Sequence, residues 1–91
     1  MKGILMKSDD DNRYPCPCCG LLTMDGPTRD TYIICPVCGW EDDDIQFNHP
    51  DHAGGANHVS LNEARANYAK FGASDKDSLK RVRPPLPHEM P

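Results

Sequence analysis

The clearest pattern of hydrophobic and polar positions lies in the segment 61–71. Apolar side chains recur there at i, i+3, i+7 and i+10, the spacing of one helical face: Leu61, Ala64, Tyr68 and Phe71. Ser60 and Glu63 form a capping box at its start, and Gly72 stands where a left-handed residue commonly ends a helix. The pattern predicts a helix over about 61–71. It must dock on the rest of the chain because it is too short to be stable alone.

Two shorter runs have the composition of β-strands. Residues 21–24 (Leu-Leu-Thr-Met) precede a turn around Gly26, and residues 31–34 (Thr-Tyr-Ile-Ile) are β-branched and aromatic. We therefore expect a β-hairpin in which these two runs pair. The segment 48–58 is rich in Gly, Pro, Asn and Asp, which predicts an irregular loop before the helix.

The candidate chemistry lies in two copies of a Cys-Pro-x-Cys-Gly pattern, at residues 16–20 and 35–39. In each copy, proline presets the start of a tight turn and glycine accepts the positive φ that closes it, so both sulfurs of the knuckle can face one point. Fifteen residues separate Cys19 from Cys35, which matches the C-x2-C-x15–20-C-x2-C spacing of zinc sites. The pattern predicts four ligands to one metal ion: Cys16, Cys19, Cys35 and Cys38.

We expect the ion to be zinc, with iron as the possible substitute, because four thiolates bind both metals. Rubredoxin knuckles are similar but lie farther apart in sequence. Four protein ligands saturate a tetrahedral ion, whereas a catalytic zinc keeps an open position. The predicted site is therefore structural. No catalytic triad, phosphate loop or carboxylate pair stands out, so we do not expect an enzyme.

The fifth cysteine, Cys18, occupies the variable position of the first knuckle. The simplest expectation is a partly exposed spectator thiol. The alternatives are a reactive or redox-active thiol, because a nearby metal site can change its pKa, and exchange with a neighbouring ligand. For His49, His52 and the nearby His58 we expect solvated loop side chains, and the alternative is a second metal site.

Charge limits the classes of partner. The 91-residue chain carries a formal net charge of -4, and its strongest charge runs are acidic, at 9–11 and 41–44. Nucleic-acid binding depends on clustered Lys and Arg, so it is disfavoured. For the run from Glu41 to Asp44 we expect solvated surface; a site for a cation or a basic partner is the alternative. Trp40 is expected to cover the metal site, and Phe47 to join the core.

No stretch approaches the roughly 20 apolar residues of a membrane span, and no signal-peptide pattern is present. We therefore expect a cytoplasmic protein, where clustered cysteines indicate metal or catalysis more often than disulfides. Five cysteines would also leave one unpaired in a disulfide framework. A monomer is favoured.

These elements predict a small α+β metal-stabilised domain with zinc-ribbon or rubredoxin-like knuckles, a β-hairpin and one C-terminal α-helix. We expect a flexible leader at 1–13, a single domain at 14–87 and a terminal tail at 88–91. Within the domain, the knuckles occupy 16–39, and a proline-rich extended tail occupies 75–87.

The chain also resembles the cysteine-rich CPCC family of small bacterial proteins. The resemblance rests on Tyr-Pro-Cys-Pro-Cys-Cys-Gly at 14–20, on the second knuckle followed by Trp-Glu-Asp-Asp, on Gly-Gly-Ala-Asn at 54–57, and on segments of the helix and tail. It covers about residues 14–87. It implies a stand-alone domain in which Cys18 is a family feature, and it implies a bacterial source. It carries over no established activity.

Together these observations favour a non-enzymatic zinc-binding module that binds another protein. A thiol-redox protein that uses Cys18 and a nucleic-acid-binding zinc ribbon are the alternatives.

Overall fold

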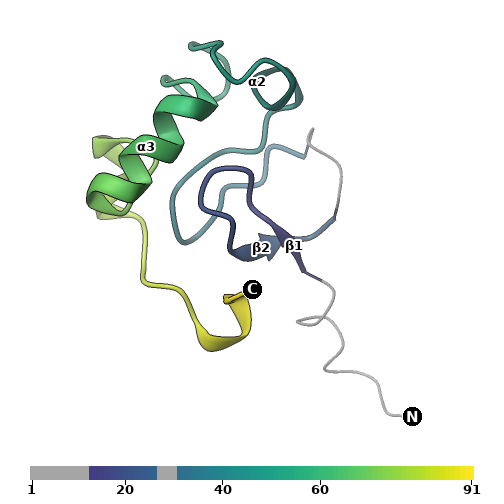
Figure 1. Ribbon diagram of the computed structural model, residues 1–91, viewed down its shortest axis with the longest axis vertical. Helices are drawn as coiled ribbons and strands as arrows, with labels where there is room; N and C mark the ends of the chain where they lie inside the picture. The colour runs from purple at the N-terminus through teal and green to yellow at the C-terminus, as the bar shows by residue number, and fades with distance from the viewer. Residues whose placement is uncertain (1–12, 27–30) are drawn as a thin grey trace.

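The computed structural model describes residues 13–26 and 31–91 (Figure 1). Its elements are β1 (Tyr14–Pro15), β2 (Leu22–Met24), α2 (Asp44–Asn48), α3 (Leu61–Phe71) and two 3-10 helices, η1 (Lys76–Lys80) and η2 (Pro87–Glu89). The expected leader lies outside the described residues except for Arg13. That side chain donates a hydrogen bond to the carbonyl of Thr23 and forms an ion pair with Asp25 at 3.2 Å.

The short hairpin encloses the first knuckle. β1 and β2 pair antiparallel, with Tyr14 opposite Met24 and Pro15 opposite Leu22. Ile34 and Glu41 form a single antiparallel bridge around the second knuckle. The two-stranded hairpin and the main helix confirm the predicted fold class. The predicted pairing of 21–24 with 31–34 was wrong. Each knuckle reverses the chain within a few residues, so the segment before a knuckle pairs with the segment that follows the same knuckle.

Helix α3 spans Leu61–Phe71, as the hydrophobic pattern predicted. Ser60 Oγ accepts a hydrogen bond from the backbone N–H of Glu63 at 3.1 Å, and Gly72 ends the helix at φ +87°. Leu61 and Ala64 are fully buried against the cysteines. Arg65 Nε donates to the carbonyl of Pro17 at 2.8 Å, which joins the helix to the first knuckle.

The core gathers around the knuckles rather than between large apolar layers. Besides the cysteines it contains Leu21, Met24, Val37, Trp40, Leu61 and Ala64. Trp40, expected to cover the metal site, is completely buried in this cluster. Phe47 was expected there too, but it remains 37% exposed. The reason is that the short helix α2 turns its neighbour Gln46 inward instead.

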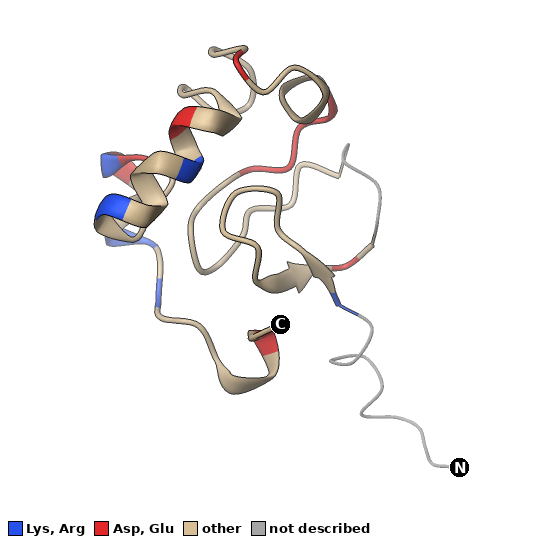
Figure 2. Ribbon diagram, in the orientation of Figure 1, with Lys and Arg blue, Asp and Glu red and all other residues tan. Residues whose placement is uncertain are grey.

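The acidic run is only partly solvated surface (Figure 2). Asp42 and Asp43 are buried, so the expectation is wrong for these two residues. Asp43 caps α2 by accepting hydrogen bonds from the N–H groups of Ile45 and Gln46, and it also accepts one from Ala56. Burial raises the pKa of Asp43, but these three backbone donors outweigh that effect, so its pKa lies below the usual value.

The loop 48–58 contains no helix or strand beyond the end of α2, but side chains anchor it to the body. Gln46 Nε2 lies within hydrogen-bond distance of the carbonyls of His52, Asn57 and Val59. The amide of Asn57 in turn bonds both the N–H and the carbonyl of Glu41. A buried amide network therefore fixes the loop where an apolar core would otherwise be needed.

The C-terminal segment differs from the expected extended tail. Residues 82–86 are irregular, but η1 and η2 flank them. Asp75 starts η1 by accepting a hydrogen bond from the N–H of Ser78 at 2.9 Å. η2 returns the chain to β2, and Glu89 is buried there. Within the expected terminal tail at 88–91, Glu89 therefore belongs to the folded domain, where an ion pair described below holds it, whereas Met90 is 55% exposed.

Replacing Leu61 by Ala should lower the free energy of unfolding of the metal-loaded protein by about 2–5 kcal/mol, since it leaves a cavity between α3 and the cysteines. Leu79→Ala makes the same change at a side chain that is 46% exposed, and should cost clearly less. Chemical denaturation of both variants with excess metal measures the difference. Equal losses would contradict the docking of α3 described here.

Candidate metal centre

The two knuckles have the same backbone closure. In the first, the N–H of Gly20 donates to the carbonyl of Cys16 at 2.8 Å; in the second, that of Gly39 donates to Cys35 at 2.9 Å. Both glycines have positive φ, +80° and +88°. This is the left-handed conformation that the Cys-Pro-x-Cys-Gly pattern predicted, and glycine adopts it without steric cost.

The knuckles bring the four predicted ligands together. Their sulfur atoms all lie within 4.8 Å of one another. The sulfur of Cys16 lies 3.6 Å from that of Cys38, and the sulfur of Cys19 lies 3.8 Å from that of Cys35. A tetrahedral ion with metal–sulfur bonds near 2.3 Å needs sulfur separations of about 3.8 Å. A disulfide would need about 2.05 Å, and all five cysteines are free. The donor set and its spacing therefore fit one tetrahedral ion.

Hydrogen-bond donors surround the sulfurs. The backbone N–H of Cys18 points at Cys16 Sγ, and that of Trp40 points at Cys38 Sγ, each at 3.4 Å. Thr23 Oγ1 lies 3.1 Å from Cys35 Sγ, where its hydroxyl can donate to a thiolate. Such bonds stabilise negative charge on metal-bound sulfur and orient the ligands.

The cluster cannot by itself hold four negative charges. The pKa of Cys35 lies far below its usual value, because the thiols of Cys16, Cys19 and Cys38, and after them Thr23, donate hydrogen bonds to its thiolate. Hydrogen bonding among the thiols, together with burial, places the pKa of those other three cysteines far above the usual value. One thiolate is thus favoured and three are disfavoured. A bound cation supplies the charge that lets all four ionise.

Cys18 is buried, so the expectation of a partly exposed thiol was wrong. It is 8% exposed and packs in the same cluster as the ligands. Val37, at the equivalent position of the second knuckle, is 1% exposed. The variable position of each knuckle therefore faces the core. A reactive role for Cys18 remains a prediction, and burial limits the access of reagents to it.

The histidines of the loop lie away from the cysteines. His49, His52 and His58 are exposed. Within residues 13–26 and 31–91, the four cysteines form the only group of His, Cys, Asp or Glu side chains placed closely enough to share an ion.

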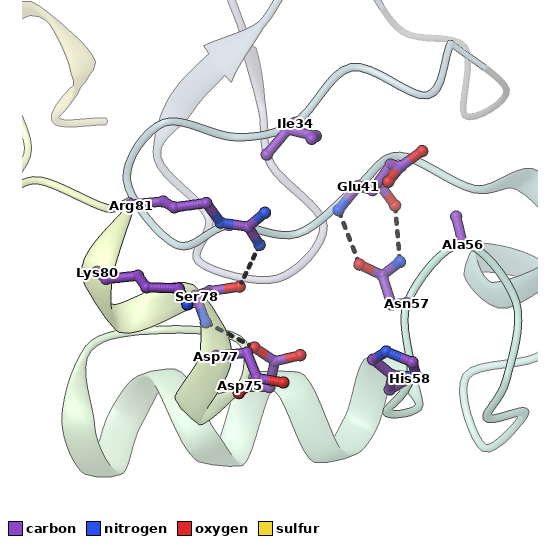
Figure 3. A pocket seen from close by; sticks show the side chains of 11 residues that line it. Ile34, Glu41, Ala56, Asn57, His58, Asp75, Asp77, Ser78, Lys80 and Arg81 are labelled. Atoms are coloured by element: carbon purple, nitrogen blue, oxygen red, sulfur yellow. Dashed lines mark hydrogen bonds between the residues drawn. The ribbon is translucent and has the colours of Figure 1, made fainter.

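A second feature, a hollow of about 490 Å³, opens between the Ile34–Glu41 bridge, the loop 48–58 and η1 (Figure 3). Lys80 and Arg81 lie on one side, opposite His58. Arg81 donates to Ser78 Oγ, whereas within the described ranges the carboxylate of Glu41 has no side-chain partner. Sequence reasoning missed this hollow because η1 comes beside the loop only in the folded chain.

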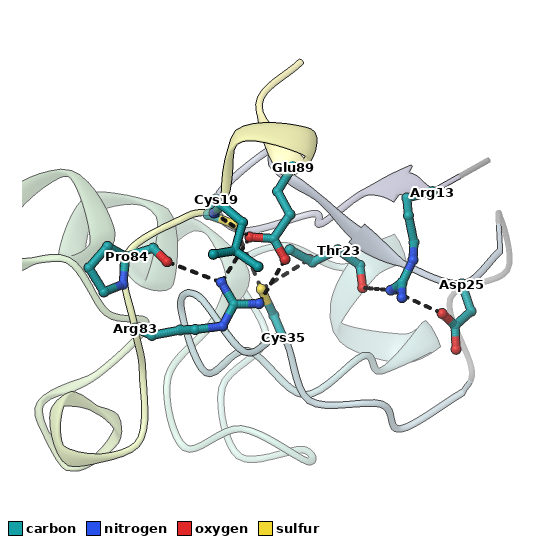
Figure 4. Close-up of polar contacts among 9 residues, drawn as sticks. Arg13, Cys19, Thr23, Asp25, Cys35, Arg83, Pro84 and Glu89 are labelled. Atoms are coloured by element: carbon teal, nitrogen blue, oxygen red, sulfur yellow. Dashed lines mark hydrogen bonds and ion pairs between the residues drawn. The ribbon is translucent and has the colours of Figure 1, made fainter. Parts of the chain in front are cut away.

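The third feature is a C-terminal clasp made by Arg83, Leu86 and Glu89 (Figure 4). The guanidinium of Arg83 donates to both carboxylate oxygens of Glu89, at 2.9 and 2.8 Å, and the N–H of Leu86 donates to one of them. The Arg83 hydrogen bonds are the largest cause that lowers the pKa of Glu89 to about 2. The available sequence signal was that Arg83 is followed six residues later by the acidic Glu89. This spacing alone does not predict that the C-terminal segment returns to the domain.

A sequence profile of the cysteine-rich CPCC family matches residues 14–89. The chain belongs to the cysteine-rich CPCC family. The CPCC match contains both knuckles, α3 and Glu89, so the clasp lies inside the family domain. A comparison with curated proteins returned no match. In the part of the chain that the structure describes, no helix has the length and apolar character needed to cross a bilayer.

The two knuckle glycines offer a matched test. Gly20→Ala should destabilise the CPCC domain by about 1–2 kcal/mol, the cost of a left-handed L-residue. Gly39→Ala should cost more, because its Cβ would lie 2.6 Å from the Cβ of Ser78, while nothing lies within 4 Å of a Cβ at Gly20. Thermal unfolding of the metal-loaded variants compares them. A larger loss for Gly20→Ala would contradict the contact between knuckle and η1.

Proposed function

We propose that this CPCC protein is a non-enzymatic, zinc-stabilised module that binds another protein. The observation that carries the proposal is the cluster of four sulfur atoms within 4.8 Å, which supplies a complete tetrahedral ligand set. Four thiolates leave no position for water or substrate on the ion. The metal therefore acts by holding the two knuckles together.

Zinc is the metal favoured by the spacing of the knuckles, and iron is the alternative that the same ligands accept. Structural zinc in small peptides contributes about 10–16 kcal/mol of apparent binding energy near neutral pH. The core here is small and contains polar side chains such as Asp42 and Gln46. Zinc binding is then a main source of folding free energy for the domain.

Exposed side chains beside the hollow support a protein partner. Ile34 is 49% exposed at its edge, and the neighbouring Tyr32 is 59% exposed. Tyr32 has φ +58°, which a bulky residue rarely adopts, and its N–H donates to the carbonyl of Asp42. Strain held at an exposed aromatic residue is typical of functional surfaces. The partner places an apolar side chain against Ile34 and a cationic group near Glu41.

The charge of the protein gives less support to nucleic-acid binding. The formal net charge is -4, and Lys and Arg alternate with acidic residues over α3 and η1 (Figure 2). Backbone phosphates would need a clustered basic surface.

Cysteine-to-serine variants test the metal. The purified wild-type chain should contain one zinc per molecule by native mass spectrometry, and removing it with a chelator should abolish most tertiary structure in near-ultraviolet circular dichroism. Cys38→Ser should lose both its zinc and its folded structure, because it removes one of the four sulfurs. Cys18→Ser makes the same change outside the ligand set and should keep the stoichiometry. Bound iron, or loss of zinc in Cys18→Ser, would contradict the assignment.

A quantitative capture experiment tests the partner surface. Zinc-loaded protein carrying Ile34→Asp and Glu41→Lys should lose a partner that the wild type captures from an extract of its source organism. The control is Ile45→Asp, a similar change at a side chain that is 60% exposed on α2 and does not line the hollow. Equal capture by both variants would exclude this surface. Turnover of a substrate by the purified protein would exclude the non-enzymatic role.

A further inference from the structure

The metal site is more open on one side than on the others. Cys16, Cys35 and Cys38 are 2% exposed or less, whereas Cys19 is only half-buried. Cys19 Sγ lies 3.8 Å from Cys35 Sγ. An ion held by the four sulfurs is therefore most accessible to water and to competing ligands at Cys19, and the edge between Cys19 and Cys35 borders that opening.

The C-terminal clasp lies at this edge. The backbone N–H of Arg83 donates to the carbonyl of Pro36, the residue after Cys35, at 3.2 Å. At its other end, η2 packs against β2, which carries the Thr23 hydroxyl that contacts Cys35. The segment 83–89 thus runs from Pro36, next to Cys35, to β2. Figure 4 shows Arg83 and Glu89 together with Thr23 and Cys35.

The charges of the clasp suit this position. Four thiolates around a divalent ion carry a net charge of -2, which a nearby cation stabilises. The hydrogen bonds to Glu89 raise the pKa of Arg83 above its usual value, so the guanidinium stays charged. The Glu89 side chain is 6% exposed, so its paired contact with Arg83 keeps the guanidinium in place and satisfies a buried carboxylate at the same time.

We infer that the Arg83–Glu89 ion pair holds the C-terminal segment over the Cys35 side of the metal site, shields that side from solvent and slows the escape of the ion. The inference rests on the zinc binding proposed above and adds a kinetic role for the tail. Without the clasp, η2 separates from β2 and that side opens to solvent while α3 and the knuckles stay folded. Arg83 and Glu89 are positioning residues, since neither is a ligand.

The test is the rate at which the full-length, zinc-loaded protein transfers its ion to an excess of a colorimetric chelator at neutral pH. Arg83→Gln and Glu89→Gln should each release zinc about tenfold faster or more, within the range of effects of residues that support metal ligands. Asp25→Asn removes the exposed Arg13–Asp25 pair, and its rate should stay within about twofold of wild type.

Leu61→Ala separates local opening from global unfolding, because it weakens the packing of α3 and leaves the residues of the clasp unchanged. When each variant is assayed at the same interval below its own melting temperature, the clasp variants should lose zinc faster than Leu61→Ala. Brief alkylation followed by mass spectrometry should label Cys35 before the other two buried ligands, Cys16 and Cys38, in the clasp variants, and should label all three together in Leu61→Ala. Labelling order gives a readout that a merely structural role for the tail would not change.

Three results would overturn the inference. Release rates of Arg83→Gln and Glu89→Gln within about twofold of wild type would exclude the clasp while leaving zinc binding intact. Equal rates for the clasp variants and Leu61→Ala at matched stability would show that the ion leaves through global unfolding. A wild-type chain that takes up no zinc would defeat this inference and the proposed function together.

Discussion

The mutual repulsion of four thiolates at one point is the constraint on which the rest of this fold depends. The sulfur atoms lie as close as 3.6 Å, and hydrogen bonding among the thiols favours one ionised group over four. A cation reverses that preference because it interacts with every sulfur at once. The two knuckles, far apart in sequence, then become one rigid centre against which the remaining elements can pack.

That centre explains why the domain needs so little regular structure. The sheet has two short strands, and the buried apolar side chains lie mostly around the cysteines. Elsewhere, polar groups determine the course of the chain: Asp43 starts α2, and Gln46 with Asn57 anchors the loop. Each of these groups is buried and hydrogen-bonded, which makes their positions specific. The fold therefore combines a four-cysteine centre suited to one metal ion with buried polar anchors.

The same arrangement gives the second knuckle two neighbouring surfaces with different proposed roles. The hollow beside Ile34 and Glu41 lies where this knuckle meets η1, and its exposed apolar and charged groups are the proposed contacts of a partner. The clasp joins the same knuckle to β2 beside Cys35. If both proposals hold, partner binding and metal retention depend on one knuckle, and a change at either surface can act on the other.

The local sequence determined the features whose causes are local. The Cys-Pro-x-Cys-Gly pattern specifies each knuckle, since proline and glycine restrict the backbone over five residues, and Ser60 and Gly72 set the ends of α3. Tertiary structure decided the rest. Strand pairing, the burial of Asp42 and Cys18, and the Arg83–Glu89 contact depend on which segments meet after the knuckles join. No repeating pattern along the sequence marks those contacts, because each of them joins residues that only the folded protein brings together.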